Sequence, residues 1–148
     1  MITGITVGAY DMFHIGHLNV FRNARTTETG IGRLVVGVAS DGRISKYKNK
    51  RPVFSENERM EMVKSCRYVD DCFINDGDPD KIEAYTELAV KYGAKKWFVG
   101  SDWLGSEKWK KIGEELDKIG CELVYLPHTD GISTTDIVGR ILAGARPV

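Results

Sequence analysis

Short runs of apolar and β-branched residues alternate along this chain with longer stretches in which apolar residues recur every three or four positions. The short runs are typical of buried β-strands, and the longer spacing is that of helices with one apolar face. The pattern predicts strands at Ile2–Val7, Leu34–Ala39, Val69–Ile74, Lys96–Val99 and Glu122–Leu126. It predicts helices at Ile15–Thr27, Ser55–Arg67, Lys81–Tyr92, Glu107–Ile119 and Thr134–Leu142.

This alternation of strand and helix predicts an α/β fold, a single doubly wound sheet of five parallel strands with helices on both faces. Right-handed crossovers then bring the carboxyl ends of the strands to one edge, where such folds bind ligands. Ser55 with Glu58 fits a helix-capping box, and Gly93 and Gly120 stand where helices should stop. The segment Asp41–Val53 has no regular pattern, and we expect a mobile loop over the ligand edge.

Composition limits the class of protein. The 148 residues are 42% hydrophobic and 28% charged, which fits one globular domain over residues 1–148. With 21 basic and 21 acidic residues the net charge is zero, so a globally basic nucleic-acid binder is not indicated. Three irregularly spaced cysteines predict a reducing cytoplasm rather than a disulfide framework. No secretory leader or membrane-spanning segment is expected.

The turn after the first predicted strand carries the strongest chemical signal. His14 and His17 stand where a helix begins, with Gly16 between them. Free N–H groups and partial positive charge at a helix start suit phosphate, and two imidazoles there can donate to the same anion. Gly8 lets a ligand approach the backbone, and Asp11 either orients this turn or simply caps it. Half of a metal site is the weaker alternative, because His128 is the only other histidine and the cysteines show no paired spacing.

Three further groups of residues follow the predicted strands. The first is a basic run, which could form a flap over a polyanionic substrate or a solvated surface loop: Arg43, Lys46, Lys48, Lys50 and Arg51. Arg59 and Arg67 lie two turns apart on one predicted helix, where they could share a phosphate-binding face or pair with neighbouring glutamates. Gly131–Thr135 places hydroxyls at the start of the last helix, as a second anion cradle or an ordinary helix cap.

All four groups project to one edge of the predicted sheet. Together they supply two anion cradles, a basic flap and an arginine face. This combination suits a nucleoside triphosphate and a second phosphorylated molecule.

The same residues resemble a known family. Gly8–His17 resembles the HxGH signature of the nucleotidyltransferase superfamily, and Gly131–Thr135 resembles its second signature in the form found in cytidylyltransferases. Arg67-Tyr68-Val69-Asp70 and Gly100-Ser101-Asp102-Trp103 also match that branch. The resemblance covers nearly the whole chain and is greatest to the short bacterial glycerol-3-phosphate cytidylyltransferases. It implies a Rossmann-like nucleotidyltransferase fold.

The resemblance also implies a reaction. An oxygen of a phosphorylated acceptor, glycerol 3-phosphate first, attacks the α-phosphorus of CTP and pyrophosphate leaves, without a covalent enzyme intermediate. Mg²⁺ accompanies the triphosphate through phosphate oxygens and waters. The product, CDP-glycerol, would serve cell-wall polymers such as teichoic acid. Related enzymes are commonly homodimers, and neither nucleic acid nor a membrane is an expected partner.

Site roles follow by the same resemblance. His14, His17 and Lys46 are the expected catalytic residues. The expected CTP contacts are Gly8, Ala9, Tyr10, Asp11, Gly16, Arg59, Asp102, His128, Gly131, Ile132, Ser133 and Thr134. The acceptor phosphate is assigned to Lys46, Lys48 and Arg67.

Two departures from the family pattern matter. Tyr10 stands where the family usually has phenylalanine, and His128 stands where it has arginine. A histidine is ordinarily charged only below about pH 6.5, so a permanent charge near the nucleotide is missing. Trp103 and Trp109 could line an interface or the nucleotide pocket.

Alternative functions remain open at this level. Phosphoethanolamine, phosphocholine or another polyol phosphate could be the acceptor. The Thr-Asp-Gly-Ile-Ser-Thr-Thr context argues against adenylyl transfer from ATP, and the retained histidines and lysines argue against a non-catalytic nucleotide sensor.

Overall fold

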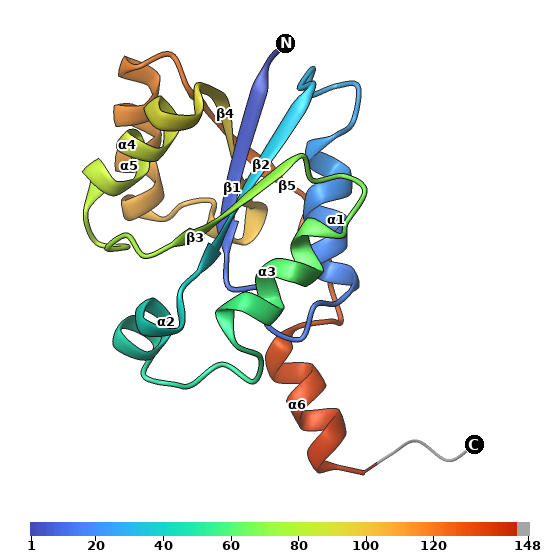
Figure 1. Ribbon diagram of the computed structural model, residues 1–148. Helices are drawn as coiled ribbons and strands as arrows, with labels where there is room; N and C mark the ends of the chain where they lie inside the picture. The colour runs from blue at the N-terminus through green and yellow to red at the C-terminus, as the bar shows by residue number, and fades with distance from the viewer. Residues whose placement is uncertain (145–148) are drawn as a thin grey trace.

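The computed structural model describes residues 1–144 and confirms the predicted α/β fold (Figure 1). The last four residues of the predicted domain, 145–148, lie outside the described part. The strands are β1 (Thr3–Gly8), β2 (Arg33–Ala39), β3 (Asp71–Asn75), β4 (Ala94–Gly100) and β5 (Glu122–Leu126). The helices are α1 (Ile15–Ala24), α2 (Asp41–Lys48), α3 (Glu56–Lys64), α4 (Ile82–Tyr92), α5 (Glu107–Lys118) and α6 (Thr134–Leu142), with a short 3₁₀ turn at Ser101–Trp103.

The five strands form one parallel sheet in the order β3-β2-β1-β4-β5. The chain winds outward from β1 through β2 to β3, and then crosses to β4 on the other side of β1. The carboxyl ends of β1 and β4 therefore flank the point at which the winding reverses. In open α/β sheets this is where the flanking loops diverge and leave a crevice for a ligand.

Both faces of the sheet are covered by helices. Side chains alternate across a strand, so Val35 packs with α4 and α5 while Val36 packs with α1 and α3. Trp97 and Phe98 divide between the two faces in the same way, and all four side chains are buried. Figure 1 shows α4 and α5 on one side of the sheet and α1 and α3 on the other. The strand ends that border the crevice therefore belong to a sheet that is packed on both faces.

The prediction of a loop over Asp41–Val53 is wrong for its first eight residues, because Asp41–Lys48 forms α2. Ser40 caps this helix by accepting a hydrogen bond from the Arg43 N–H at 3.0 Å. Ile44 is its one buried residue. A single apolar anchor produces no helical periodicity, so the hydrophobic pattern alone could not reveal this helix.

The predicted helix at Ser55–Arg67 ends three residues early, at Lys64. The Asp70 N–H donates to the Leu34 carbonyl at 2.9 Å, and the Asp70 carboxylate accepts from the Leu34 N–H at 2.7 Å. The chain must therefore turn before residue 70 to enter the sheet beside β2. Tertiary pairing overrides the local helical pattern here.

Within residues 1–144, the structure contains no helix of the length and apolar character that crossing a bilayer requires.

Candidate active site

The two histidines of the first motif cap α1. His14 is the N-cap residue, and its Nδ1 accepts a hydrogen bond from the Gly16 N–H at 3.0 Å. His17 Nδ1 accepts from the His14 N–H at 3.3 Å, and the two ring centroids lie 3.7 Å apart in a stacked arrangement. A ring nitrogen that accepts a hydrogen bond carries no proton, so both rings hold their proton on Nε2. Each histidine can therefore donate one hydrogen bond from Nε2 to an anion.

The surroundings keep these rings neutral. Burial, followed by the neighbouring His14 and Lys48, lowers the pKa of His17 to about 3, although Asp11 opposes the shift. Burial also lowers the pKa of His14. Both histidines are thus neutral hydrogen-bond donors near pH 7 rather than fixed positive charges.

Gly16 has a steric reason to be glycine. A Cβ there would lie 2.8 Å from the His14 ring and 3.4 Å from Cγ2 of Ile132. The second motif therefore packs directly against the turn between the two histidines.

Asp11 holds the parts of the site together. Its carboxylate accepts hydrogen bonds from the N–H groups of Val53 at 2.7 Å and Phe54 at 2.9 Å. Its backbone carbonyl accepts from the Thr134 hydroxyl at 3.3 Å. Asp11 thus joins the first motif to the segment after α2 and to the start of α6.

Arg59 lies inside the protein, with 1% of its surface exposed. Its guanidinium donates to the carbonyls of Ala9 and Ala39 at 2.7 Å and of Phe54 at 3.0 Å, and to the Asp41 carboxylate at 2.7 Å. These bonds use four of its five N–H groups. Arg59 therefore ties the ends of β1 and β2 to α2 and α3, and the donors expected to face the nucleotide are already engaged.

The expected shared face of Arg59 and Arg67 is wrong. Because α3 ends at Lys64, Arg67 falls beyond the helix, where its guanidinium donates to the Tyr68 hydroxyl at 2.9 Å. Arg67 lies beside Arg22 in a separate surface depression between α1 and the end of α3. The position of Arg67 therefore gives no support to the acceptor-phosphate role expected for it.

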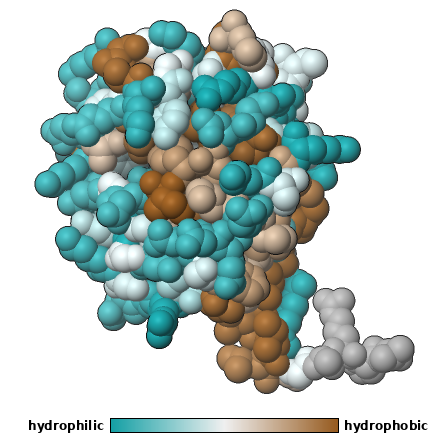
Figure 2. Space-filling model, in the orientation of Figure 1, coloured by the Kyte–Doolittle hydropathy of each residue, from teal (hydrophilic) through white to brown (hydrophobic). Residues whose placement is uncertain are grey.

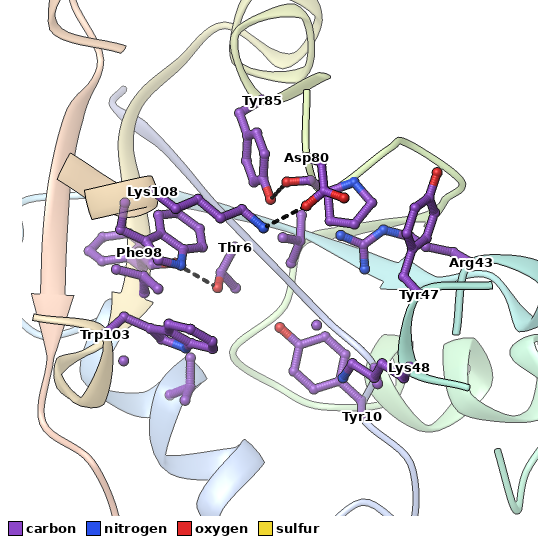
Figure 3. Close-up of a pocket in the computed structure, with 18 residues that line it drawn as sticks. Thr6, Tyr10, Arg43, Tyr47, Lys48, Asp80, Tyr85, Phe98, Trp103 and Lys108 are labelled. Carbon is purple, nitrogen blue, oxygen red and sulfur yellow. Dashed lines mark hydrogen bonds and ion pairs between the residues drawn. The ribbon is translucent and has the colours of Figure 1, made fainter. Parts of the chain in front are cut away.

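A cavity of about 490 Å³ opens at the carboxyl ends of β1 and β4 (Figure 3). Its charged lining residues are Arg43, Lys48, Asp80 and Lys108. Its aromatic lining residues are Tyr10, Tyr47, Tyr85, Phe98, Trp103 and Trp109. Both tryptophans that the sequence left unassigned therefore face this cavity.

Of the two lysines expected to bridge the substrates, Lys48 reaches the cavity. Burial and the nearby cations Lys50, Arg43 and Arg59 lower the pKa of Lys48, as expected for an ammonium group in a crowded positive site. Lys46 is exposed and its ammonium group lies over the Tyr47 ring, 5.2 Å from the centroid, outside the cavity lining.

The second motif begins α6. Ser133 is the N-cap residue, and its hydroxyl accepts from the Asp136 N–H at 3.0 Å. Gly131 has a φ of +77°, a backbone conformation that favours glycine. Through the bonds to Asp11 and the packing on Gly16, the structure brings the two predicted anion cradles side by side.

Asp102 and His128 meet at the same edge of the sheet. Asp102 follows β4, His128 follows β5, and Nδ1 of the histidine lies 3.9 Å from the carboxylate. The His128 N–H donates to the Ser101 hydroxyl at 3.2 Å. Both side chains are half exposed, so they are free to contact a ligand.

Sequence reasoning missed Tyr47, Asp80 and Lys108. Asp80 lies just before α4, and Lys108 lies in the first turn of α5. Each follows a strand at its carboxyl end, which was the available signal. Neither Asp80 nor Lys108 belongs to a recognisable motif, so no stronger signal marked them.

Comparison with known proteins gives a consistent result. The profile of the family described as Cytidylyltransferase-like matches residues 5–140. A glycerol-3-phosphate cytidylyltransferase of Staphylococcus aureus is 36% identical over 134 residues, which are 90% of this chain and 89% of the relative. An FAD synthase of Korarchaeum cryptofilum is 33% identical over 140 residues, or 93% and 90% of the two chains.

Two other similarities extend this result. An ethanolamine-phosphate cytidylyltransferase of Dictyostelium discoideum is 35% identical over 91% of this chain, which corresponds to 35% of the longer relative. The crystal structure of a lipopolysaccharide core biosynthesis protein from Thermoplasma volcanium superimposes with a TM-score of 0.65 at 21% identity, over 87% of this chain and 97% of the other. The latter similarity concerns the fold alone.

Proposed function

Because the chain belongs to the cytidylyltransferase-like family, we propose that it transfers a cytidylyl group from CTP to glycerol 3-phosphate. CDP-glycerol and pyrophosphate are the products. The observation that carries this proposal is the contact between the two anion cradles, through Thr134 to Asp11 and Ile132 to Gly16. Two helix starts in contact can bind a chain of phosphates through the N–H groups that their caps leave free.

The proposed reaction is a single in-line displacement. An oxygen of the acceptor phosphate forms a bond to the α-phosphorus of CTP, while the bond from that phosphorus to the bridging oxygen breaks and its electron pair leaves with pyrophosphate. His14 and His17 donate from Nε2 to the triphosphate as negative charge spreads over it. Lys48 attracts both phosphates, and Ser133 and Thr134 bind the β- and γ-phosphates. Catalysis then consists of positioning and charge stabilisation.

Mg²⁺ enters this proposal as part of the substrate, bound to the triphosphate oxygens and water. Residues 1–144 contain no group of three or more histidine, cysteine, aspartate or glutamate side chains arranged to hold a metal ion. A site that receives the ion together with its nucleotide requires no such group, since Mg²⁺ commonly binds through substrate phosphates and waters.

The acceptor is the part of this proposal that the relatives leave most open. Their names include a glycerol-3-phosphate cytidylyltransferase, an ethanolamine-phosphate cytidylyltransferase and an FAD synthase at similar identity. We favour glycerol 3-phosphate because the relative with that name matches at 36% identity over 89% of its own length. The other two acceptor types are the alternatives that experiment must exclude.

The decisive experiment measures pyrophosphate release from each of CTP, ATP, GTP and UTP against glycerol 3-phosphate, phosphoethanolamine, phosphocholine and FMN. We expect turnover with CTP and glycerol 3-phosphate, and a loss of about 100-fold or more in kcat for His17→Ala. Nucleotide binding without turnover for every acceptor would identify a sensor instead. Preferential turnover of ATP with FMN would replace the proposed reaction by flavin adenylylation.

We also propose that two copies of the chain associate. The support is a groove of about 880 Å³ between α3 and α6, lined mainly by apolar residues that include Phe13, Phe54, Met62, Ile137 and Ile141. No residue of α6 is buried, and Figure 2 shows its hydrophobic side chains where the helix projects from the body. An exposed apolar face of this kind is typical of an interaction surface.

The charges around this groove suit a second copy of the same chain. Glu58 and Glu61 line the groove, while Arg22 and Arg67 line the adjoining depression, and Met62 borders both. A two-fold axis pairs a surface with itself, so it can bring the acidic end of one copy against the basic end of the other. A stable interface commonly buries about 800 Å² on each partner, so we expect the contact to extend over both the groove and the depression.

A further inference from the structure

The central cavity has two chemically different ends (Figure 3). At one end Trp103 and Trp109, from the turn after β4 and from α5, offer flat apolar surfaces, and the buried Phe98 of β4 borders the same cavity. At the other end Arg43, Tyr47 and Lys48 of α2 offer cations and a phenol. Aromatic faces suit a nucleobase, and cations suit a phosphorylated acceptor.

The reacting phosphorus would lie nearest the α2 end. The Tyr10 ring lies 5.4 Å from the His17 ring, centroid to centroid, and Lys48 is close enough to His17 to depress its pKa. Tyr10 and Lys48 both line the cavity. The acceptor must approach the α-phosphorus opposite the leaving pyrophosphate, so its organic part has to occupy the adjoining α2 end of the cavity.

The backbone turn that carries Asp80 is held in place beside this end. Its N–H donates to the Asp78 carboxylate at 2.9 Å, and the Tyr85 hydroxyl donates to the neighbouring Pro79 carbonyl at 3.0 Å. These two bonds fix the turn on which Asp80 stands. The side chain itself is 77% exposed, so its carboxylate oxygens are free to accept hydrogen bonds from a ligand.

Lys108 reaches across the cavity from α5 toward this carboxylate, with its ammonium nitrogen 3.8 Å from an Asp80 oxygen (Figure 3). Arg43 lies on the other side, anchored by a hydrogen bond from its Nε to the Gly77 carbonyl at 2.8 Å. The one carboxylate of the cavity lining therefore shares the cavity with three cations, Arg43, Lys48 and Lys108, of which Lys108 is paired with it. With three cations to one carboxylate, the lining carries a net positive charge, which attracts anions and disfavours an added ammonium group.

We propose that Asp80 and Lys108 select the acceptor. Asp80 accepts hydrogen bonds from the hydroxyl groups of a phosphorylated polyol, and Lys108 and Arg43 exclude acceptors that carry an ammonium group. This inference rests on the proposed cytidylyl transfer. It identifies the acceptor class from the side chains that would contact the acceptor. A polyol phosphate offers hydroxyl groups to Asp80 and negative charge to the cations, whereas a phosphorylated amino alcohol adds a cation to a cavity whose lining already holds three.

The test compares acceptors rather than absolute rates. In Lys108→Met the stem remains but the charge is removed, so the ratio of kcat/KM for phosphoethanolamine to that for glycerol 3-phosphate should rise about 10-fold. Lys110→Met removes a charge from an exposed position on the same helix outside the cavity lining, and should leave the ratio unchanged. An equal ratio in the wild type and Lys108→Met overturns the proposed exclusion.

Asp80→Asn tests whether Asp80 accepts hydrogen bonds from the hydroxyl groups of the acceptor. We expect KM for glycerol 3-phosphate to rise about 10-fold while KM for CTP stays within about 2-fold, because a charged hydrogen-bond acceptor is lost on the acceptor side alone. The exposed Asp117→Asn on α5 is the matched control. A rise in KM for CTP instead would mean that Asp80 binds the ribose of the nucleotide. That result would overturn the assignment of Asp80 to the acceptor.

Failure of this inference can be separated from failure of the proposed function. Wild-type turnover of CTP with an unchanged acceptor ratio in Lys108→Met leaves the reaction intact and removes the selection mechanism. Calorimetric titration of the wild type and variants with glycerol 3-phosphate and phosphoethanolamine gives a second readout that needs no turnover. Tighter binding of phosphoethanolamine by the wild type contradicts the proposal directly.

Discussion

The residues of this site divide into those that face the cavity and those that hold the others in place. Lys48 faces the cavity, whereas Arg59 is buried and engaged with four acceptors from four parts of the chain. A planar guanidinium can satisfy such a set of oxygens, and an ammonium group cannot reach them all. Arg59 is thus a positioning residue that acts through the turn and helices it connects.

We expect Arg59→Lys to lower the free energy of unfolding by about 2–4 kcal/mol, because several buried carbonyls lose their donor. KM for CTP should rise as well, since the turn after β1 and α2 lose a common anchor. Arg33→Lys is the control, because Arg33 forms an exposed pair with Asp71 that contributes little. Urea unfolding measures both variants, and similar midpoints for the two would contradict the anchoring role.

His17 should make the protein sensitive to acid. Its pKa is about 3 in the folded chain and ordinarily near 6.5, so at intermediate pH the unfolded chain binds a proton that the folded chain does not. The contribution of His17 to stability is complete above pH 6.5 and declines as pH falls toward 3. The loss amounts to about 2 kcal/mol at pH 5.

The test of this prediction is His17→Gln, which keeps an acceptor for the capping bond to the His14 N–H. Unfolding free energies at pH 7.5 and pH 5.0 should differ less in this variant than in the wild type. His128→Gln, at a half-exposed histidine, should retain the wild-type difference. The same pH difference in all three proteins would show that His17 is not responsible.

His128 governs a different property. We expect His128→Arg to lower KM for CTP and to flatten its pH dependence around neutrality, because arginine stays charged throughout this range. Asp102, 3.9 Å from the imidazole, is placed to orient the new guanidinium. Steady-state kinetics between pH 6 and pH 8 provide the measurement. Unchanged KM values at every pH would exclude a charge effect of this residue on the nucleotide.

Among the secondary-structure elements, α2 shows how a short helix can be specified without a hydrophobic pattern. It depends on the Ser40 cap, on Asp41 in its first turn, on Lys46 and Lys48 in its last turn, and on one buried residue, Ile44. The charges complement the helix dipole. Because α2 also carries Arg43 and Tyr47 into the cavity, we expect its caps to affect acceptor binding as well as stability.

Ser40→Ala should therefore cost about 1 kcal/mol of unfolding free energy and raise KM for the acceptor. The hydroxyl both caps α2 and donates to the Asp76 carboxylate, so the variant loosens the helix at both contacts. Ser55→Ala removes the matching cap of α3 and should lower stability by a similar amount, with a smaller change in KM. Equal effects of both variants on KM would argue against a specific role of α2.

At the scale of the whole molecule, the two faces of the sheet are covered but α6 is not. The helix begins at the predicted anion cradle and exposes Ile141 and Leu142 near its end. A second copy packed on the groove between α3 and α6 would cover these side chains. The second copy would also restrict the motion of the start of α6, which contacts the rest of the chain through the Thr134 bond to Asp11.

Ile141→Asp should dissociate the proposed dimer, because it places a charge in the apolar lining of the groove. Light scattering after size exclusion should give the mass of two chains for the wild type and of one for the variant. Val90→Asp on α4 is a close control, since both side chains are 67% exposed before substitution. A wild-type protein with the mass of one chain would contradict the proposed association.

The sequence by itself determined the fold class, the positions of all five strands and the two motifs by which the chain resembles its family. Periodicity, turn glycines and motif spacing are local properties, so they can be read along the chain. Only the tertiary structure decided that Arg59 is buried, that Lys48 rather than Lys46 reaches the cavity, and that Asp80 meets Lys108. Which side chains meet depends on where helices end and how crossovers stack them, and distant parts of the chain fix both.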